Sequence, residues 1–168
     1  MKLGIVCGYS SILDENLITY LENVITVSQE NQIYNLILSG GYTSKKLELS
    51  EARLMFEFIQ KQKGGLNLIL EEESLTTLHN LLLSRKIIND LSISYDYLYI
   101  FCDNVRFVKV YLLSKIIFKD QCIEVIRLSR KEPIYWYFMQ IPSTIFQILG
   151  VFFPPVEKIL LLLRRQNR

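Results

Sequence analysis

The stretch Leu36-Ile37-Leu38-Ser39-Gly40-Gly41 places an apolar run directly before a serine and two glycines. A short apolar run of this kind is typical of a buried strand, and glycine allows the backbone to turn tightly and to approach a ligand closely. Residues 3–7, an apolar run that ends at Gly8, repeat the arrangement near the N-terminus. The sequence therefore predicts strands whose ends form polar turns.

The same unit of strand and helix recurs along the chain. Strands are expected at residues 3–7, 36–38, 66–70, 97–101 and 123–128, with helices that begin near Asp14, Ser50, Ser74 and Asn104. Each parallel pair of strands needs a crossover helix, so this alternation favours a mostly parallel sheet covered on both faces. We predict an α/β fold, a Rossmann-like three-layer sandwich with a five-stranded sheet, whose strand ends line a binding crevice.

Two further polar segments fall where helices are expected to begin. Ser50 suits an N-cap and Glu51 suits the first turn of a helix, so a capping role and a ligand-binding role are about equally supported. Ser74 and Thr77 place hydroxyl groups at the next helix start, and Asn80 lies on the same face as Thr77. Because helix N-termini bind anions readily, these residues are candidates for ligand binding.

Glu71 stands at the end of an apolar strand, just before this hydroxyl cluster. A carboxylate in this place could accept a sugar hydroxyl, ligate a metal or act as a base, so Glu71 is the candidate catalytic residue. Further candidate ligand contacts are Gly8, Ser39, Gly40, Gly41 and Asp103. A plain strand exit explains an isolated pair of glycines as well. The loop at 42–49 could fold over a ligand.

Arg106 and Lys109 break a local rule, because both lie in the first turns of a helix expected to be capped by Asp103 or Asn104. The helix dipole disfavours cations there by about 0.3–1 kcal/mol each. Such a conflict at the mouth of a crevice indicates an anionic ligand, to which Arg106 could donate a bidentate pair of hydrogen bonds. The alternative is that Asp103 or a nearby glutamate pairs with them.

Three motifs in this order resemble a known family, the bacterial domain of unknown function shared by the YdcF, SanA and ElyC proteins. Ser39-Gly40-Gly41 is similar to its SGG turn, Ser50-Glu51-Ala52 to its SEA helix start, and Glu71, Ser74, Thr77 and Asn80 to its E-x-x-S-x-x-T-x-x-N signature. The resemblance covers roughly residues 3 to 128. It implies a Rossmann-like ligand crevice, envelope-related roles for some members, and a nucleotide or S-adenosylmethionine as a candidate cofactor.

The chain also departs from that family pattern. Arg106 stands where the family usually carries a histidine, and His79 stands where an acidic residue is common. The resemblance therefore does not imply an activity that depends on those two family residues. The resemblance implies binding of a ligand, with or without its transformation.

Composition excludes several classes of protein. The single histidine excludes metal clusters of several histidines, and three distant cysteines give no disulfide framework. Residues 127–168 carry seven Lys/Arg and two Glu, a net charge of +5, but long apolar runs separate these charges, so nucleic acid is a poor fit. The N-terminal apolar run is too short for a secretory signal, which favours a cytoplasmic location.

The tail has a different composition from the rest, and we expect two parts, residues 1–130 and 131–168. No charged residue occurs from Pro133 to Val156, yet Pro142, Gly150 and two further prolines interrupt this segment, so two short helices are expected rather than one spanning helix. These helices could pack on the sheet or on a second subunit. Alternatively, they could lie on the inner surface of an anionic membrane.

The sequence thus predicts a protein that binds a small anionic ligand, nucleotide-like or phosphorylated, at the strand ends. The competing hypothesis is a non-catalytic binding or scaffold protein, associated with the membrane and linked to envelope processes.

Overall fold

The computed structural model describes residues 1–168 except 43–48, 63–64, 120, 130–131 and 167–168. Its strands form one parallel sheet in the order β3-β2-β1-β4-β5, which confirms the predicted Rossmann-like α/β fold. The strands are β1 (Lys2–Cys7), β2 (Asn35–Ser39), β3 (Asn67–Glu71), β4 (Tyr97–Asp103) and β5 (Cys122–Leu128).

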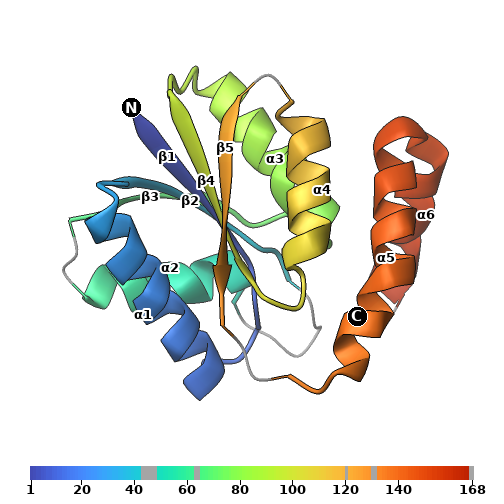
Figure 1. The fold of residues 1–168 in the computed structure, drawn as a ribbon, viewed down its shortest axis with the longest axis horizontal. Coiled ribbons are helices and arrows are strands. Elements are labelled where there is room, and N and C mark those ends of the chain that lie inside the picture. Colours follow the sequence, from blue (N-terminus) through green and yellow to red (C-terminus); the bar gives the residue numbers. More distant parts are fainter. Residues whose placement is uncertain (43–48, 63–64, 120, 130–131, 167–168) are drawn as a thin grey trace.

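Helices cover both faces of the sheet (Figure 1). One apolar cluster joins the sheet to α1 and α2, and a second joins it to α3 and α4. The four helices are α1 (Glu15–Glu30), α2 (Glu51–Lys61), α3 (Thr77–Asp90) and α4 (Phe107–Ile117). Each crossover between successive strands contains one of these helices, so all strands run in the same direction. Their carboxyl ends therefore lie together at one edge of the sheet.

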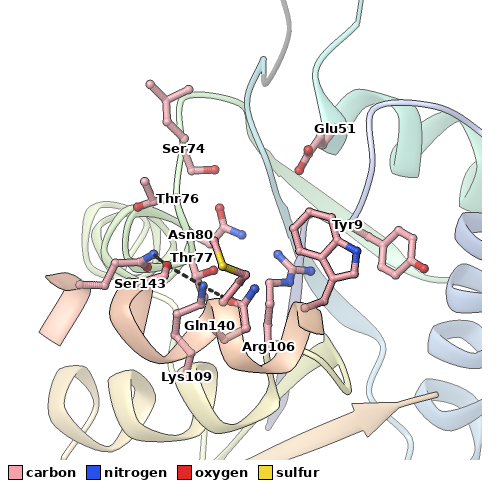
Figure 2. A pocket seen from close by; sticks show the side chains of 15 residues that line it. Tyr9, Glu51, Ser74, Thr76, Thr77, Asn80, Arg106, Lys109, Gln140 and Ser143 are labelled. Carbon is pink, nitrogen blue, oxygen red and sulfur yellow. Dashed lines mark hydrogen bonds between the residues drawn. The ribbon is translucent and has the colours of Figure 1, made fainter. Parts of the chain in front are cut away.

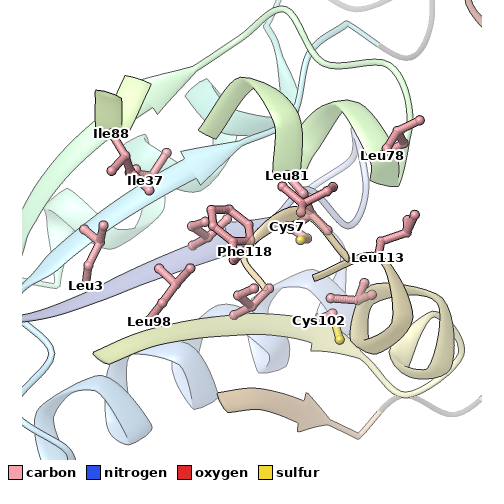
Figure 3. Packing of buried hydrophobic residues seen from close by; sticks show 14 residues of the cluster. Leu3, Cys7, Ile37, Leu78, Leu81, Ile88, Leu98, Cys102, Leu113 and Phe118 are labelled. Atoms are coloured by element: carbon pink, nitrogen blue, oxygen red, sulfur yellow. The ribbon is translucent and has the colours of Figure 1, made fainter. Parts of the chain in front are cut away.

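Successive residues of each strand face opposite layers. Ile5 belongs to the cluster under α3 and α4, whereas Val6 belongs to the cluster under α1 and α2. Figure 3 shows Leu81 of α3 and Leu113 of α4 packed over the sheet near Cys7. Burial of both faces explains why the strands are continuous apolar runs in the sequence.

The helix starts follow the capping residues only in part. Asp14 and Ser50 are N-caps as expected, since their side chains accept hydrogen bonds from the amides of Leu17 (2.8 Å) and Arg53 (2.9 Å). The N-cap of α3 is Thr76, two residues after the expected Ser74.

The start of α4 also differs from the prediction. The helix begins at Phe107, and Asp103 acts from outside it by accepting a hydrogen bond from the Arg106 amide at 3.0 Å.

The tail forms two helices, α5 (Tyr135–Phe152) and α6 (Pro154–Gln166), which run side by side in opposite directions (Figure 1). Pro142 lies inside α5 without ending it, so the first helix is longer than expected. α5 packs against α3 and α4, on the outer side of the sandwich. Among the described helices, none combines the length and apolarity needed to cross a bilayer.

Candidate ligand-binding site

A cavity of about 450 Å³ lies at the carboxyl ends of the strands, beneath α5. Segments that follow β1 and β4 line it, and these two strands meet where the sheet order reverses, the usual position of ligands in parallel α/β sheets. Its lining consists of Gly8, Tyr9, Glu51, Ser74, Leu75, Thr76, Thr77, Asn80, Arg106, Lys109, Trp136, Met139, Gln140, Ser143 and Gln147.

Seven of the residues singled out from the sequence meet in this lining: Gly8, Glu51, Ser74, Thr77, Asn80, Arg106 and Lys109. Asp103 lines a smaller adjoining cavity of about 230 Å³ that shares Tyr9 and Arg106 with the first. The remaining candidates, Ser39, Gly40, Gly41, Ser50 and Glu71, are not among the residues that line the larger cavity. Ser39 and Glu71 are hydrogen-bonded to each other, and Gly40 and Gly41 pack against Glu51 and Ser74.

The carboxylate of Glu71 is occupied by its own turn. Its Oε1 accepts hydrogen bonds from the amides of Glu73 (2.7 Å) and Ser74 (2.9 Å), and its Oε2 accepts one from the hydroxyl of Ser39. The side chain is almost fully buried. A catalytic role for Glu71 stays a prediction, while this geometry favours a positioning role.

The glycines of the first turns make room for other parts of the protein. A Cβ atom on Gly41 would lie 2.4 Å from the carbonyl oxygen of Ser74, and one on Gly8 would lie 2.2 Å from Oε2 of Glu51. A Cβ on Gly40 would lie 2.7 Å from the Cβ of Glu51. We expected these glycines to let the backbone approach a ligand closely. They instead let the backbone approach Glu51 and the turn after β3.

Glu51 brings its carboxylate to the cavity wall beside Gly8, at the first residue of α2. Figure 2 shows it pointing toward the same space as the guanidinium of Arg106, from the opposite side. Its neighbour Ser50 caps α2 and also donates a hydrogen bond to Glu72 at 2.7 Å. Of the two glutamates of the candidate site, Glu51 is the one that faces the cavity.

The N-terminus of α3 has already used several of its hydrogen-bond donors. The amide of His79 donates to the hydroxyl of Thr76 (3.2 Å), and the amide of Leu78 donates to the side-chain oxygen of Gln147 from α5 (2.9 Å). An anion bound at this helix start would thus accept hydrogen bonds from the hydroxyls of Ser74 and Thr77 more than from the backbone amides of the first turn.

His79 is buried and links two distant helices. Its ring contacts the hydroxyl of Thr76 at 3.1 Å through Nδ1 and the carboxylate of Glu157 in α6 at 2.9 Å through Nε2. The imidazole therefore ties α6 to the start of α3.

Arg106 lies between the two cavities, with 18% of its side chain exposed. Its Nε donates to the carboxylate of Asp103, so the ion pair that we weighed as the alternative is present. Burial opposes a charged guanidinium, but the Asp103 carboxylate outweighs this effect and keeps the pKa of Arg106 above its ordinary value. Within the described part of the chain, its Nη2 is buried and has no hydrogen-bond partner.

Lys109 is also buried, one turn further along α4. Its ammonium group donates hydrogen bonds to Gln140 at 2.6 Å and to Ser143 at 3.3 Å, both in α5 (Figure 2).

The roof that α5 forms over the cavity was not predicted from the sequence. Gln140, Ser143 and Gln147 face inward, and Trp136 and Met139 complete the roof. The signal was present, because the first three residues have the spacing i, i+3 and i+7, which makes one polar stripe on an otherwise apolar helix.

Below the cavity, the thiol of Cys7 closes the end of β1. Burial raises its pKa to about 11, although Arg106 and a hydrogen bond with Asn80 act in the opposite direction. Burial likewise raises the pKa of Cys102. These thiols stay protonated at neutral pH, which fits packing and not nucleophilic chemistry.

The loop expected to fold over a ligand falls largely on 43–48, outside the described residues.

Comparison with family models, curated proteins and solved structures finds no match for this chain. The fold and the site define an α/β protein with a polar cavity at the strand ends. The resemblance to the YdcF, SanA and ElyC family rests on its three motifs and stays a prediction.

Proposed function

We propose that this chain binds a small anionic ligand, phosphorylated or nucleotide-like, in the cavity at the strand ends. The observation that carries the proposal is Nη2 of Arg106, a buried guanidinium nitrogen without a partner among the described residues, on a group that lines the cavity. A buried donor left without an acceptor is costly, and a phosphate or carboxylate oxygen would remove that cost.

The neighbouring groups fit the same ligand. Lys109 adds a second buried cation, and the hydroxyls of Ser74 and Thr77 can donate to anionic oxygens. A volume of about 450 Å³ suits a mononucleotide-sized molecule. The rings of Tyr9 and Trp136 also line the cavity and offer flat apolar surfaces for a base.

Glu51 adds a carboxylate to this cavity, opposite in charge to Arg106 and Lys109. Its carboxylate stands across from Arg106, where it suits a ribose hydroxyl or a proton that leaves the ligand (Figure 2). The family resemblance adds S-adenosylmethionine to the candidates, since its carboxylate could pair with Arg106 while its ribose meets Glu51.

Calorimetric titration tests the proposal with inorganic phosphate, AMP, ADP and S-adenosylmethionine as probes. Lys109→Met should weaken binding of the phosphorylated probes by about 1.5–3 kcal/mol, the usual contribution of a hydrogen bond to a charged group. Lys115→Met is the matched control, because Lys115 is an exposed lysine at the other end of α4. Equal affinities of wild type and Lys109→Met for every probe would remove Lys109 from the ligand site.

A further inference from the structure

The helix α5 has its polar and apolar sides reversed relative to an ordinary surface helix. Gln140, Ser143 and Gln147 face the domain, whereas the opposite side carries a stripe of apolar residues more than half exposed. This stripe, the outer face of α5, consists of Phe138, Ile141, Ile145 and Phe152. A soluble helix normally turns such a stripe toward its core.

Specific hydrogen bonds fix this orientation. Gln147 accepts from the amide of Leu78 at the start of α3, and Gln140 accepts from the ammonium group of Lys109 in α4. Rotation of α5 to bury its apolar side would break both contacts and take the acceptor away from the buried amide of Leu78. The apolar stripe therefore has to face outward.

The second tail helix extends the exposed surface. Ile159 and Leu162 of α6 are more than half exposed, and α6 packs beside α5. Glu157, the sole acidic residue between Pro133 and Arg168 in the sequence, is engaged by His79. We call the outer face of α5 together with Ile159 and Leu162 the hairpin face.

The sequence of α6 carries more basic than acidic residues. Lys158 of α6 is exposed, and Arg164 and Arg165 fall in the last turns of α6. An isologous contact between two copies would bring two tails of charge +5 together, whereas an anionic surface would attract them.

We propose that the hairpin face binds the interface of an anionic lipid bilayer, with α5 parallel to the membrane plane. Apolar burial of aromatic and aliphatic side chains would combine with attraction of the basic residues. Tyr135, Trp136 and Tyr137 at the start of α5 are partly exposed and suit the depth of the lipid headgroups. The helix lies on the bilayer, because none of the described helices is able to span it.

Vesicle flotation with the full chain tests this inference. The probes are phosphatidylcholine vesicles with and without phosphatidylglycerol, at low and high salt. The chain should float with the anionic vesicles at low salt, and the double variant Phe138→Ser, Ile145→Ser should bind about tenfold more weakly or worse. Both positions are exposed, so the variant should keep its melting temperature.

A matched control replaces two equally exposed apolar residues outside the hairpin, Ile12→Ser with Leu91→Ser, and should bind like wild type. Trp136 is the single tryptophan, so a blue shift of its emission on binding reports contact directly.

Sedimentation velocity separates the membrane from a second copy of the chain. No flotation, together with a dimer that the double variant dissociates, would overturn the proposal in favour of a subunit interface. Equal binding of the double variant, or equal binding to neutral vesicles, would also overturn it.

Discussion

On the β3 side of the cavity the polar groups bind one another, whereas on the α4 side a guanidinium nitrogen has no hydrogen-bond partner within the part of the chain that the structure describes. Glu71 accepts two hydrogen bonds within its own turn and a third from Ser39 of β2, and the amides of Leu78 and His79 in α3 are capped by Gln147 and Thr76. Across the cavity, Arg106 uses Nε for Asp103 while its buried Nη2 has no partner among the described residues.

This difference separates scaffold from ligand contact. A closed network lowers the free energy of the folded chain without any ligand, so its residues are expected to matter for stability. A buried cation with spare donors costs stability and gains a partner only when an anion binds. The β3 side carries most of the motif residues, and we infer that it holds the cavity wall in place. The α4 side is the part that we expect to bind the ligand.

The largest expected effect is on the closed network. Glu71→Ala would leave two backbone amides and the Ser39 hydroxyl without their acceptor, and should lower the free energy of unfolding by about 3 kcal/mol or more. Chemical denaturation measures this loss. Glu73→Ala, in the same turn but exposed, should cost far less. A stable Glu71→Ala variant that loses phosphate binding would instead make Glu71 a ligand contact.

Neutralising Asp103 tests the α4 side of the cavity. Asp103→Asn should cost about 2 kcal/mol of stability, because the buried Arg106 loses its counter-ion. Inorganic phosphate should then raise the melting temperature of this variant more than that of wild type, since the anion replaces the missing charge. The exposed Asp96→Asn variant should show neither effect. Equal shifts in all three proteins would place phosphate elsewhere.

A smaller effect is expected where α5 caps α3. Gln147→Ala should lower the stability by about 1 kcal/mol, because the amide of Leu78 loses its acceptor. Hydrogen exchange should accelerate at that amide while the amide of Ile100, in the internal strand β4, keeps its protection. Unchanged exchange at Leu78 would show that α5 does not seal the cavity in solution.

The smallest perturbation uses the cysteines as reporters of the cavity floor. Iodoacetamide at about pH 8 should modify Cys122, which is exposed, long before Cys7, whose pKa burial raises to about 11. Mass spectrometry of the peptides gives the order. Rapid labelling of Cys7 in the folded chain would mean that the floor opens to solvent.

Local patterns in the sequence predicted the fold well. Apolar runs mark the strands because parallel strands are buried on both faces, and Asp14 and Ser50 mark helix starts because their caps are local contacts. The candidate residues that meet in the cavity were predictable for a related reason, since the ends of parallel strands converge at one edge.

Long-range contacts decided the rest. Nothing in the sequence near Glu71 shows that Ser39, from another strand, occupies its carboxylate. The sequence of the tail does not show that Gln140 and Gln147 form the inner face of α5, because their partners Lys109 and Leu78 lie on other helices.

The most direct test of the central claim is a crystal soaked in tungstate, an anomalous scatterer that mimics phosphate. We predict that the strongest anomalous peak lies in the cavity at the strand ends, within hydrogen-bonding distance of Nη2 of Arg106 and near the ammonium group of Lys109. A strongest peak on the β3 side, or no peak in the cavity while Arg106 binds protein atoms through Nη2, would contradict the account.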